Sequence, residues 1–136
     1  MREEDKSRRP SEVINDFLDY LYWAKEEQEK AWDIVTTEDD KTQDYLHKLE
    51  FCNDCGERSR IATEWHRSRV ARRAAKDRSK EFSEIYKFMA DTKNKWVLNA
   101  IKKLAGDQRH EEDYVRSERK YTNRVLKEGD GDTDNS

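Results

Sequence analysis

Apolar side chains recur every three or four residues over the first part of the chain, separated by polar and charged ones. Pro10 and Ser11 precede this pattern and suit a helix start, because proline is tolerated in the first turn and serine can satisfy exposed N–H groups. The spacing predicts one amphipathic helix of about seven turns. Its apolar positions are Val13, Phe17, Tyr20, Leu21, Ala24, Ala31, Trp32 and Val35. The stretch VTTEDD (35–40) is expected to end it, since threonines there precede acidic residues that favour a helix N-terminus.

The same spacing predicts further helices downstream. A second helix carries Tyr45 to Cys52 and ends at Gly56, and a third begins near Glu57 with a pattern that can be followed to Met89. Residues 91–94 (DTKN) predict a short turn. The last helix contains Trp96, Val97, Ala100, Ile101 and Leu104, and we expect Gly106 to interrupt it before a polar continuation to about Ser117.

This pattern predicts an all-α fold with one helical domain over residues 10–127. Only 33% of residues are hydrophobic and 43% are charged, so the apolar supply is thin for a compact monomer. We therefore expect long helices that pair as an antiparallel dimer, with a trimer of dimers as the larger alternative. Residues 1–9 and the acidic tail 128–136 are polar enough to be expected as disordered ends.

The sequence shows no signal peptide and no apolar run long enough to span a bilayer, which predicts a cytoplasmic protein. The cysteines of CNDC (52–55) are most simply free thiols in that compartment. Their spacing resembles half of a zinc site that His47 and His66 could complete, but no second C-x-x-C follows. We expect no metal and no cofactor.

Charge is segregated along the chain, although the net charge is only −3. Residues 12–55 hold 4 basic and 13 acidic side chains, whereas residues 56–80 hold 9 basic and 3 acidic ones. Residues 93–127 are again basic, with 10 basic and 5 acidic groups. Such separation creates a local positive field in a nearly neutral protein. The acidic first part disfavours duplex nucleic acid as a partner, whereas a small anion is compatible with it.

The basic helix (residues 58–80) is the main candidate for binding. At 3.6 residues per turn its cations Arg58, Arg69, Arg72, Arg73 and Lys76 group on one side. Arginine suits phosphate, because its planar fork donates two parallel hydrogen bonds and keeps its charge. The alternative is that these arginines pair with the acidic first helix. Residues 56–80 carry six more basic than acidic side chains, so some arginines can pair with the acidic helix while others bind a ligand.

The segment RSERKYTNRV (116–125) is a second candidate, because it combines an aromatic ring with several guanidinium groups just before the tail. Arginine and tyrosine together can hold a nucleotide, with the ring on a base and the guanidinium on a phosphate. We therefore expect a C-terminal loop that closes over a ligand. The chain carries no nucleophile motif, no H-E-x-x-H and no glycine-rich phosphate loop, so we do not expect an enzyme.

Several of these short motifs, in this order, resemble the first anti-Thoeris family of small helical proteins from Firmicutes phages. The resemblance rests on ERSRIA (57–62), RVARRAAKD (69–77), an aromatic near Phe88, LAGDQR (104–109) and RKYTNRV (119–125). It implies a sponge that binds a TIR-derived cyclic ADP-ribose isomer, of the glycocyclic type, without cleaving it, in the cytoplasm of the infected bacterial host. It also implies a dimer with two pockets at its interface, hexamers in some members, and cyclic dinucleotides or trinucleotides as further ligands.

The resemblance also implies which residues meet the ligand. Phe88 or Tyr121 would stack on adenine, with Phe82 an alternative to Phe88, and Asn99 would donate or accept a hydrogen bond. The diphosphate would meet Arg72, Arg73, Lys76, Arg109, Arg116, Arg119 and Arg124. Asn123 stands where we expect proline in relatives, which leaves the loop more flexible.

Two other function classes stay open on the sequence. A charged, coiled-coil-like phage protein could inhibit a host protein through its acidic first helix. A nucleic-acid-binding accessory protein is the third reading, and steep salt dependence of binding to duplex DNA would support it.

Overall fold

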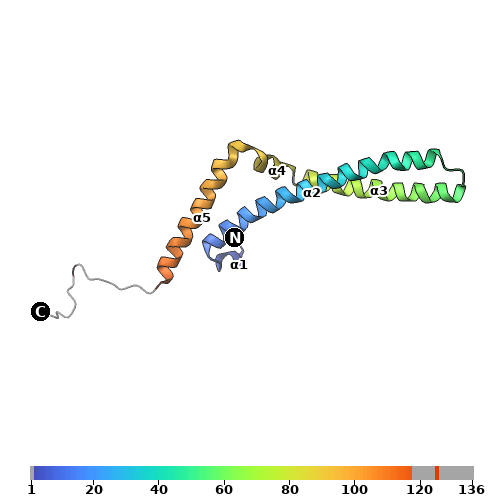
Figure 1. Cartoon of the computed structure of the whole chain (residues 1–136). Helices are drawn as coiled ribbons and strands as arrows, with labels where there is room; N and C mark the ends of the chain where they lie inside the picture. Colours follow the sequence, from blue (N-terminus) through green and yellow to red (C-terminus); the bar gives the residue numbers. More distant parts are fainter. Residues whose placement is uncertain (1, 118–124, 126–136) are drawn as a thin grey trace.

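The computed structural model describes residues 2–117 and residue 125, and this part of the chain is helical without strands. Its spine is α2, which runs over Pro10–Glu50. α3 (Cys55–Glu81) turns back along the C-terminal half of α2, and the two form a long antiparallel hairpin (Figure 1). The predicted all-α fold is therefore confirmed.

A return arm follows the hairpin and leads back to the beginning of α2. It consists of α4 (Ser83–Ala90), the 3₁₀ turn η1 (Thr92–Asn94) and α5 (Lys95–Arg116). The end of α5 lies beside the N-terminal end of α2, where the short α1 (Glu3–Lys6) also lies (Figure 1). α2 therefore has two different partners, α3 along its second half and the return arm along its first half.

α2 continues without a break through residues 35–40, so the predicted helix end there was wrong. The hydroxyl of Thr36 donates to the Trp32 carbonyl at 3.1 Å, so it bonds within the helix instead of ending it. Val35 and Glu38 are both buried in the packing of the hairpin. Tertiary burial outweighs the weak helix propensity of the two threonines.

Two glycines also behave differently from the sequence-based expectation. Gly56 lies inside the first turn of α3, and the true start signal is Asp54, whose carboxylate accepts from the Glu57 N–H at 3.1 Å. Gly106 does not interrupt α5, and a Cβ built there would meet nothing within 4 Å. An exposed helical glycine costs only about 1 kcal/mol relative to alanine, which the packed helix tolerates.

Buried side chains recur at seven-residue intervals along the seams between the helices. On α3 this repeat comprises Ile61, Ser68 and Ala75, followed by Phe82 just beyond the helix, and Ser79 is also buried. On α5 they are Leu98, Ala105 and Glu112, and on α2 they include Ser11, Leu18, Ala24, Ala31, Val35 and Glu38. A seven-residue repeat keeps a seam facing its partner helix, and small side chains let helix backbones approach closely.

Several large apolar or aromatic side chains remain on the surface of the single chain. Trp96 is 71% exposed, Trp32 52% and Phe17 53%, so the predicted apolar stripe of residues 13–35 is only partly buried. Leu104 and Val70 are also more than half exposed. Within the described residues, no helix is both long and apolar enough to cross a membrane.

Candidate functional site

A groove runs along α3, lined mainly by side chains of that helix. We call it the basic groove; its volume is about 770 Å³. Five cationic side chains and one carboxylate line it, together with Trp32 from α2: Arg69, Arg72, Arg73, Lys76, Lys80 and Asp77. Its size falls in the range of small-molecule sites. Three of the predicted ligand residues, Arg72, Arg73 and Lys76, are brought together here.

The cations of the basic groove differ in how far α2 already neutralises them. Arg73, Lys76 and Lys80 make no ion pair with any residue that the structure describes. Arg72 instead directs its fork at Asp39, with Nε 2.5 Å from Oδ1 and Nη2 3.5 Å from Oδ2. Arg73, Lys76 and Lys80 are thus available to a ligand, whereas Arg72 and Arg69 lie close to the Asp39 carboxylate.

The acidic helix does pair with part of the basic helix, as the alternative from the sequence anticipated. Asp39 also lies 4.0 Å from Arg69, and Arg78 bonds Glu27 at 3.1 Å. This hydrogen bond from Arg78 lowers the pKa of Glu27. Arg58, which the sequence grouped with the ligand residues, lies near the start of α3 and does not line the basic groove.

Trp32 supplies the aromatic surface of the basic groove. The sequence pattern placed it among the apolar positions of the amphipathic helix, and the structure leaves it 52% exposed. The reason is its direction on the helix: Ala31 and Val35 face α3, whereas the next residue after Ala31 points about 100° away. The one-residue offset of Trp32 from Ala31 was the feature of the sequence that could have identified its exposed position.

Four further predicted ligand residues lie on the return arm. Asn99, Arg109 and Arg116 are exposed on α5, and Phe88 lies on α4. The end of α5 contacts Ser11 of α2, whereas Arg72 contacts Asp39 of the same helix. These two points are separated by about 40 Å, from a rise of ~1.5 Å per residue. One chain therefore does not bring the end of α5, which carries Arg109 and Arg116, to Arg72.

Of the two phenylalanines among the candidate stacking rings, Phe82 is already used by the fold. It is 6% exposed, its ring lies edge-on to Trp23 at 5.5 Å, and the Arg78 guanidinium lies 4.8 Å from its centroid. Phe88 is 38% exposed and lines a separate apolar hollow of about 340 Å³ with Phe17 and Ile101. Only Phe88 retains a ring that a ligand could reach.

The last four predicted ligand residues, Arg119, Tyr121, Asn123 and Arg124, lie outside the described residues. The expected closing loop falls on the same segment. Both stay predictions from the sequence.

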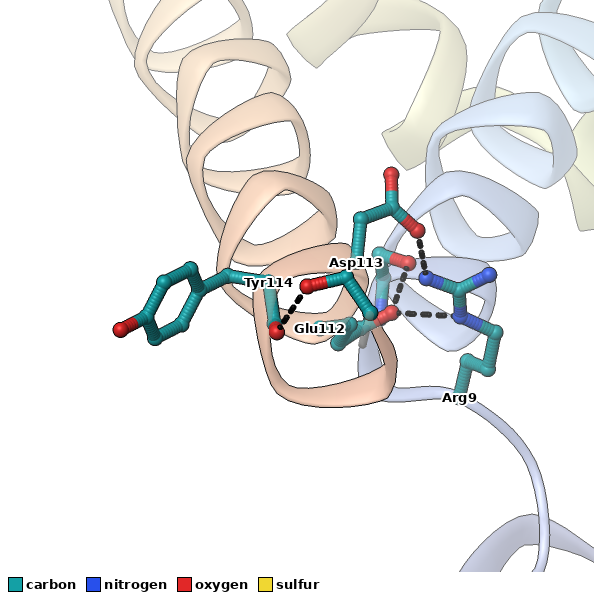
Figure 2. Close-up of polar contacts among 6 residues, drawn as sticks. Arg9, Glu112, Asp113 and Tyr114 are labelled. Carbon is teal, nitrogen blue, oxygen red and sulfur yellow. Dashed lines mark hydrogen bonds and ion pairs between the residues drawn. The ribbon is translucent and has the colours of Figure 1, made fainter. Parts of the chain in front are cut away.

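A buried carboxylate fixes the return arm to the start of α2. Glu112 accepts from the backbone N–H of Ser11 at 2.8 Å, from its hydroxyl at 2.7 Å and from Arg9 Nε at 2.9 Å. Figure 2 shows Arg9 reaching both Glu112 and Asp113, the latter at 2.5 Å. We call Arg9, Ser11, Glu112 and Asp113 the latch. It caps the positive end of α2 with negative charge from the far end of the domain.

The latch depends on Glu112 being ionised. Burial alone would raise its pKa, but the hydrogen bonds from Ser11 and Arg9 outweigh that effect and lower the pKa to about 2. The hydrogen bond from Arg9 likewise lowers the pKa of Asp113. The sequence analysis did not identify these residues, because a contact between residues 11 and 112 leaves no local pattern.

The cysteines and histidines do not form a metal site within the described residues. No group of three or more His, Cys, Asp or Glu side chains converges there. Cys52 is buried with its thiol 3.2 Å from the Asp54 carbonyl, Cys55 is exposed, and both are free. His47 lies against the Phe51 ring, and His66 lines the basic groove.

Comparisons with protein-family models, with curated protein sequences and with solved structures give no match. The chemistry of the basic groove therefore carries the functional argument.

Proposed function

We propose that this protein binds a small phosphate-bearing nucleotide in the basic groove and sequesters it without chemical change. The observation that carries the proposal is the set of cations that converge on a groove of about 770 Å³ beside an exposed indole. A phosphate can accept charge-assisted hydrogen bonds from Arg73 and Arg72, while Lys76 and Lys80 add positive charge. Sequestration needs low dissociation constants and enough protein, but no catalytic group.

The resemblance to the first anti-Thoeris family refines the proposed ligand. On that basis the ligand is a TIR-derived cyclic ADP-ribose isomer, and cyclic dinucleotides and trinucleotides are further candidates. The protein would act in the cytoplasm of an infected bacterium and keep the signal from the defence effector. A cyclic ADP-ribose isomer carries the diphosphate that the groove cations suit and the adenine that an aromatic ring suits.

Self-association is part of the proposal. The surface of one chain exposes Trp96, Leu104 and Val70, which a second copy could cover. Within one chain the end of α5, with Arg109 and Arg116, contacts Ser11, which lies about 30 Å along α2 from the groove residue Trp32. If α5 of one copy lay beside α3 of another, the predicted ligand residues of the two helices would meet in one site. The proposal therefore includes a dimer, or a hexamer made of three such dimers.

The experiment that tests the proposed function is a calorimetric titration of the full chain with cyclic ADP-ribose isomers and cyclic dinucleotides. Arg72→Ala and Arg73→Ala should each weaken binding more than about tenfold, or about 1.4 kcal/mol. Arg60→Ala is the matched control, because Arg60 lies on the same helix but does not line the groove. If all three variants bind the nucleotide as tightly as the unmodified chain does, the basic groove is not the binding site.

A second candidate, a protein-interaction function, has one observation in its favour. Asp16, Asp19, Tyr20 and Trp23 line a shallow hollow of about 440 Å³ on the first half of α2. Carboxylates beside exposed aromatic rings suit a basic segment of a partner protein. Asp19→Lys would weaken such a partner and leave nucleotide binding unchanged, whereas Arg73→Glu would do the opposite. Testing both variants therefore separates the two functions.

A further inference from the structure

We infer that Trp32 is the stacking surface for the ligand's base, so that the basic groove selects an aromatic ring that carries phosphate over phosphate alone. The inference rests on the proposed function, and it assigns a residue that neither the sequence patterns nor the resemblance had placed at the ligand. The ligand class it predicts is a nucleotide with its base on the indole and its phosphates on α3.

Trp32 is exposed and uncommitted, which distinguishes it from the other aromatic residues near the hairpin. None of the described residues places an aromatic ring or a cation against it. Trp23, by contrast, contacts both Tyr20 and Phe82 and lies 5.8 Å from the Arg78 guanidinium. An indole that is 52% exposed offers a large π surface without first breaking an internal contact.

The charges on the two sides of Trp32 give the stacked ligand a direction. Trp32 lines the basic groove and also a second hollow of about 360 Å³ that contains Glu29 and Asp33. A phosphate attached to a stacked base is attracted toward Arg73 and Lys76 and repelled from Glu29 and Asp33. The indole thus lies on the boundary between a cationic side and an anionic side.

Small side chains of α3 leave the indole accessible. Ala75 and Ser79 are buried against α2 at this level, and the Ser79 hydroxyl accepts from Gln28 Nε2 at 2.9 Å. Neither residue has a side chain long enough to cover Trp32. Larger residues at these seam positions would cover it and narrow the groove.

The test compares ADP with inorganic pyrophosphate on the full chain by calorimetry. Trp32→Ala should weaken ADP binding by about tenfold or more, because base stacking on an aromatic side chain contributes that much. Pyrophosphate binding should stay within about twofold, since its contacts are to α3 alone. Trp32→Phe should recover most of the lost ADP affinity because it restores a ring. Phe51→Ala, which removes another exposed aromatic at the far tip of the hairpin, should change neither ligand.

Two results would overturn the inference, and both differ from failure of the proposed function. If ADP and pyrophosphate lose affinity equally in Trp32→Ala, the indole shapes the groove and does not stack. If ADP affinity is unchanged in that variant, the base lies elsewhere, although the groove still binds phosphate. If neither ADP nor pyrophosphate binds the unmodified chain, this inference and the phosphate groove of the proposed function fail together.

Discussion

At the scale of single residues, Arg72 has two competing anions: the Asp39 carboxylate in the structure and the phosphate of the proposed ligand. The Nε–Oδ1 distance of 2.5 Å places the carboxylate in the guanidinium fork. Asp39 is 47% exposed, so the pair is accessible to solvent and to a competing anion. An exposed pair of this kind contributes only about 0–1 kcal/mol, which a phosphate can replace.

Asp39→Asn should therefore tighten pyrophosphate binding by about two- to fivefold at low salt. The substitution removes the competing charge and leaves Arg72 free to bind the ligand. Calorimetry at two ionic strengths measures the effect, which should shrink as salt screens the groove. Asp40→Asn is the control, because Asp40 makes no ion pair with the described residues. Weaker binding in Asp39→Asn would mean that the carboxylate positions Arg72 for the ligand.

At the scale of elements, the pairing of α2 with α3 contains a polar contact inside its apolar seam. Glu38 is 8% exposed and accepts from Ser68 Oγ at 2.7 Å and from Lys41 Nζ at 3.0 Å. These hydrogen bonds, from Ser68 and then from Lys41, lower the pKa of Glu38. A buried carboxylate stabilises one register of the two helices only while its partners are present.

Ser68→Ala should destabilise the fold by about 1–3 kcal/mol, because it leaves a buried charge with one partner fewer. Thermal and urea unfolding followed by circular dichroism measure the loss. Thr63→Ala on the exposed side of α3 should change the free energy of unfolding by less than about 0.5 kcal/mol. Restored stability in the double variant Glu38→Leu/Ser68→Ala would support the buried charge as the cause, whereas an unaltered Ser68→Ala protein would refute it.

The latch between α5 and α2 predicts a specific dependence on pH. The pKa of Glu112 is about 2 in the folded chain against an ordinary value of 4.5, so the unfolded chain binds the proton more readily. The stabilisation from Glu112 is therefore complete above about pH 4.5 and is lost as the pH falls toward 2. The Tm of Glu112→Gln should therefore fall less steeply than that of the unmodified protein as the pH is lowered from about 4.5 toward 2.

Glu111→Gln is the matched control for the latch, since Glu111 is its exposed neighbour on α5. It should keep the pH dependence of the unmodified protein. A Glu112→Gln protein whose Tm falls as steeply as that of the control would show that other carboxylates dominate acid unfolding. The next carboxylates to replace would then be those whose pKa values are also lowered: Asp113, Glu38 and Glu27.

The elements also show which parts of the structure could be predicted from sequence. Local residue types predicted the start of α2 at Pro10, the turn at 91–94 and a polar continuation of the last helix to about Ser117. They did not predict that α2 passes through 35–40, because burial of Val35 and Glu38 against α3 decides that point. The same applies to Trp32, whose exposure depends on which face of α2 receives α3. Local spacing brought Arg72, Arg73 and Lys76 together, but only the tertiary fold separates them from Arg109 and Arg116.

At the scale of the whole molecule, the structure is an extended hairpin with a return arm and not a compact bundle (Figure 1). Such a shape buries little apolar surface for its length, and Trp96 and Leu104 remain more than half exposed on α5. Apolar side chains of this size on a long helix favour contact with another chain. The exposed surface of α5 is the part of the fold that a partner copy would stabilise most.

Sedimentation velocity should therefore give a mass of at least about twice the 16.4 kDa of one chain. Leu104→Lys should shift the protein toward the monomer, because it places a charge in the apolar surface that a second copy would cover. Lys103→Ala, next to it on the exposed side of α5, should leave the mass unchanged. A single 16.4 kDa species at every concentration would contradict self-association and leave the basic groove as a site within one chain.

If the protein sequesters a nucleotide, it must hold the nucleotide and release it unchanged. To test this, the full chain is incubated with a cyclic ADP-ribose isomer, freed of unbound nucleotide and heated, and the released material is analysed by chromatography. We expect recovery of the intact ligand from the unmodified chain and from Arg60→Ala, with little from Arg73→Ala. Recovery of a cleaved product would identify an enzyme, and no ligand from any of the three proteins would contradict the proposed function.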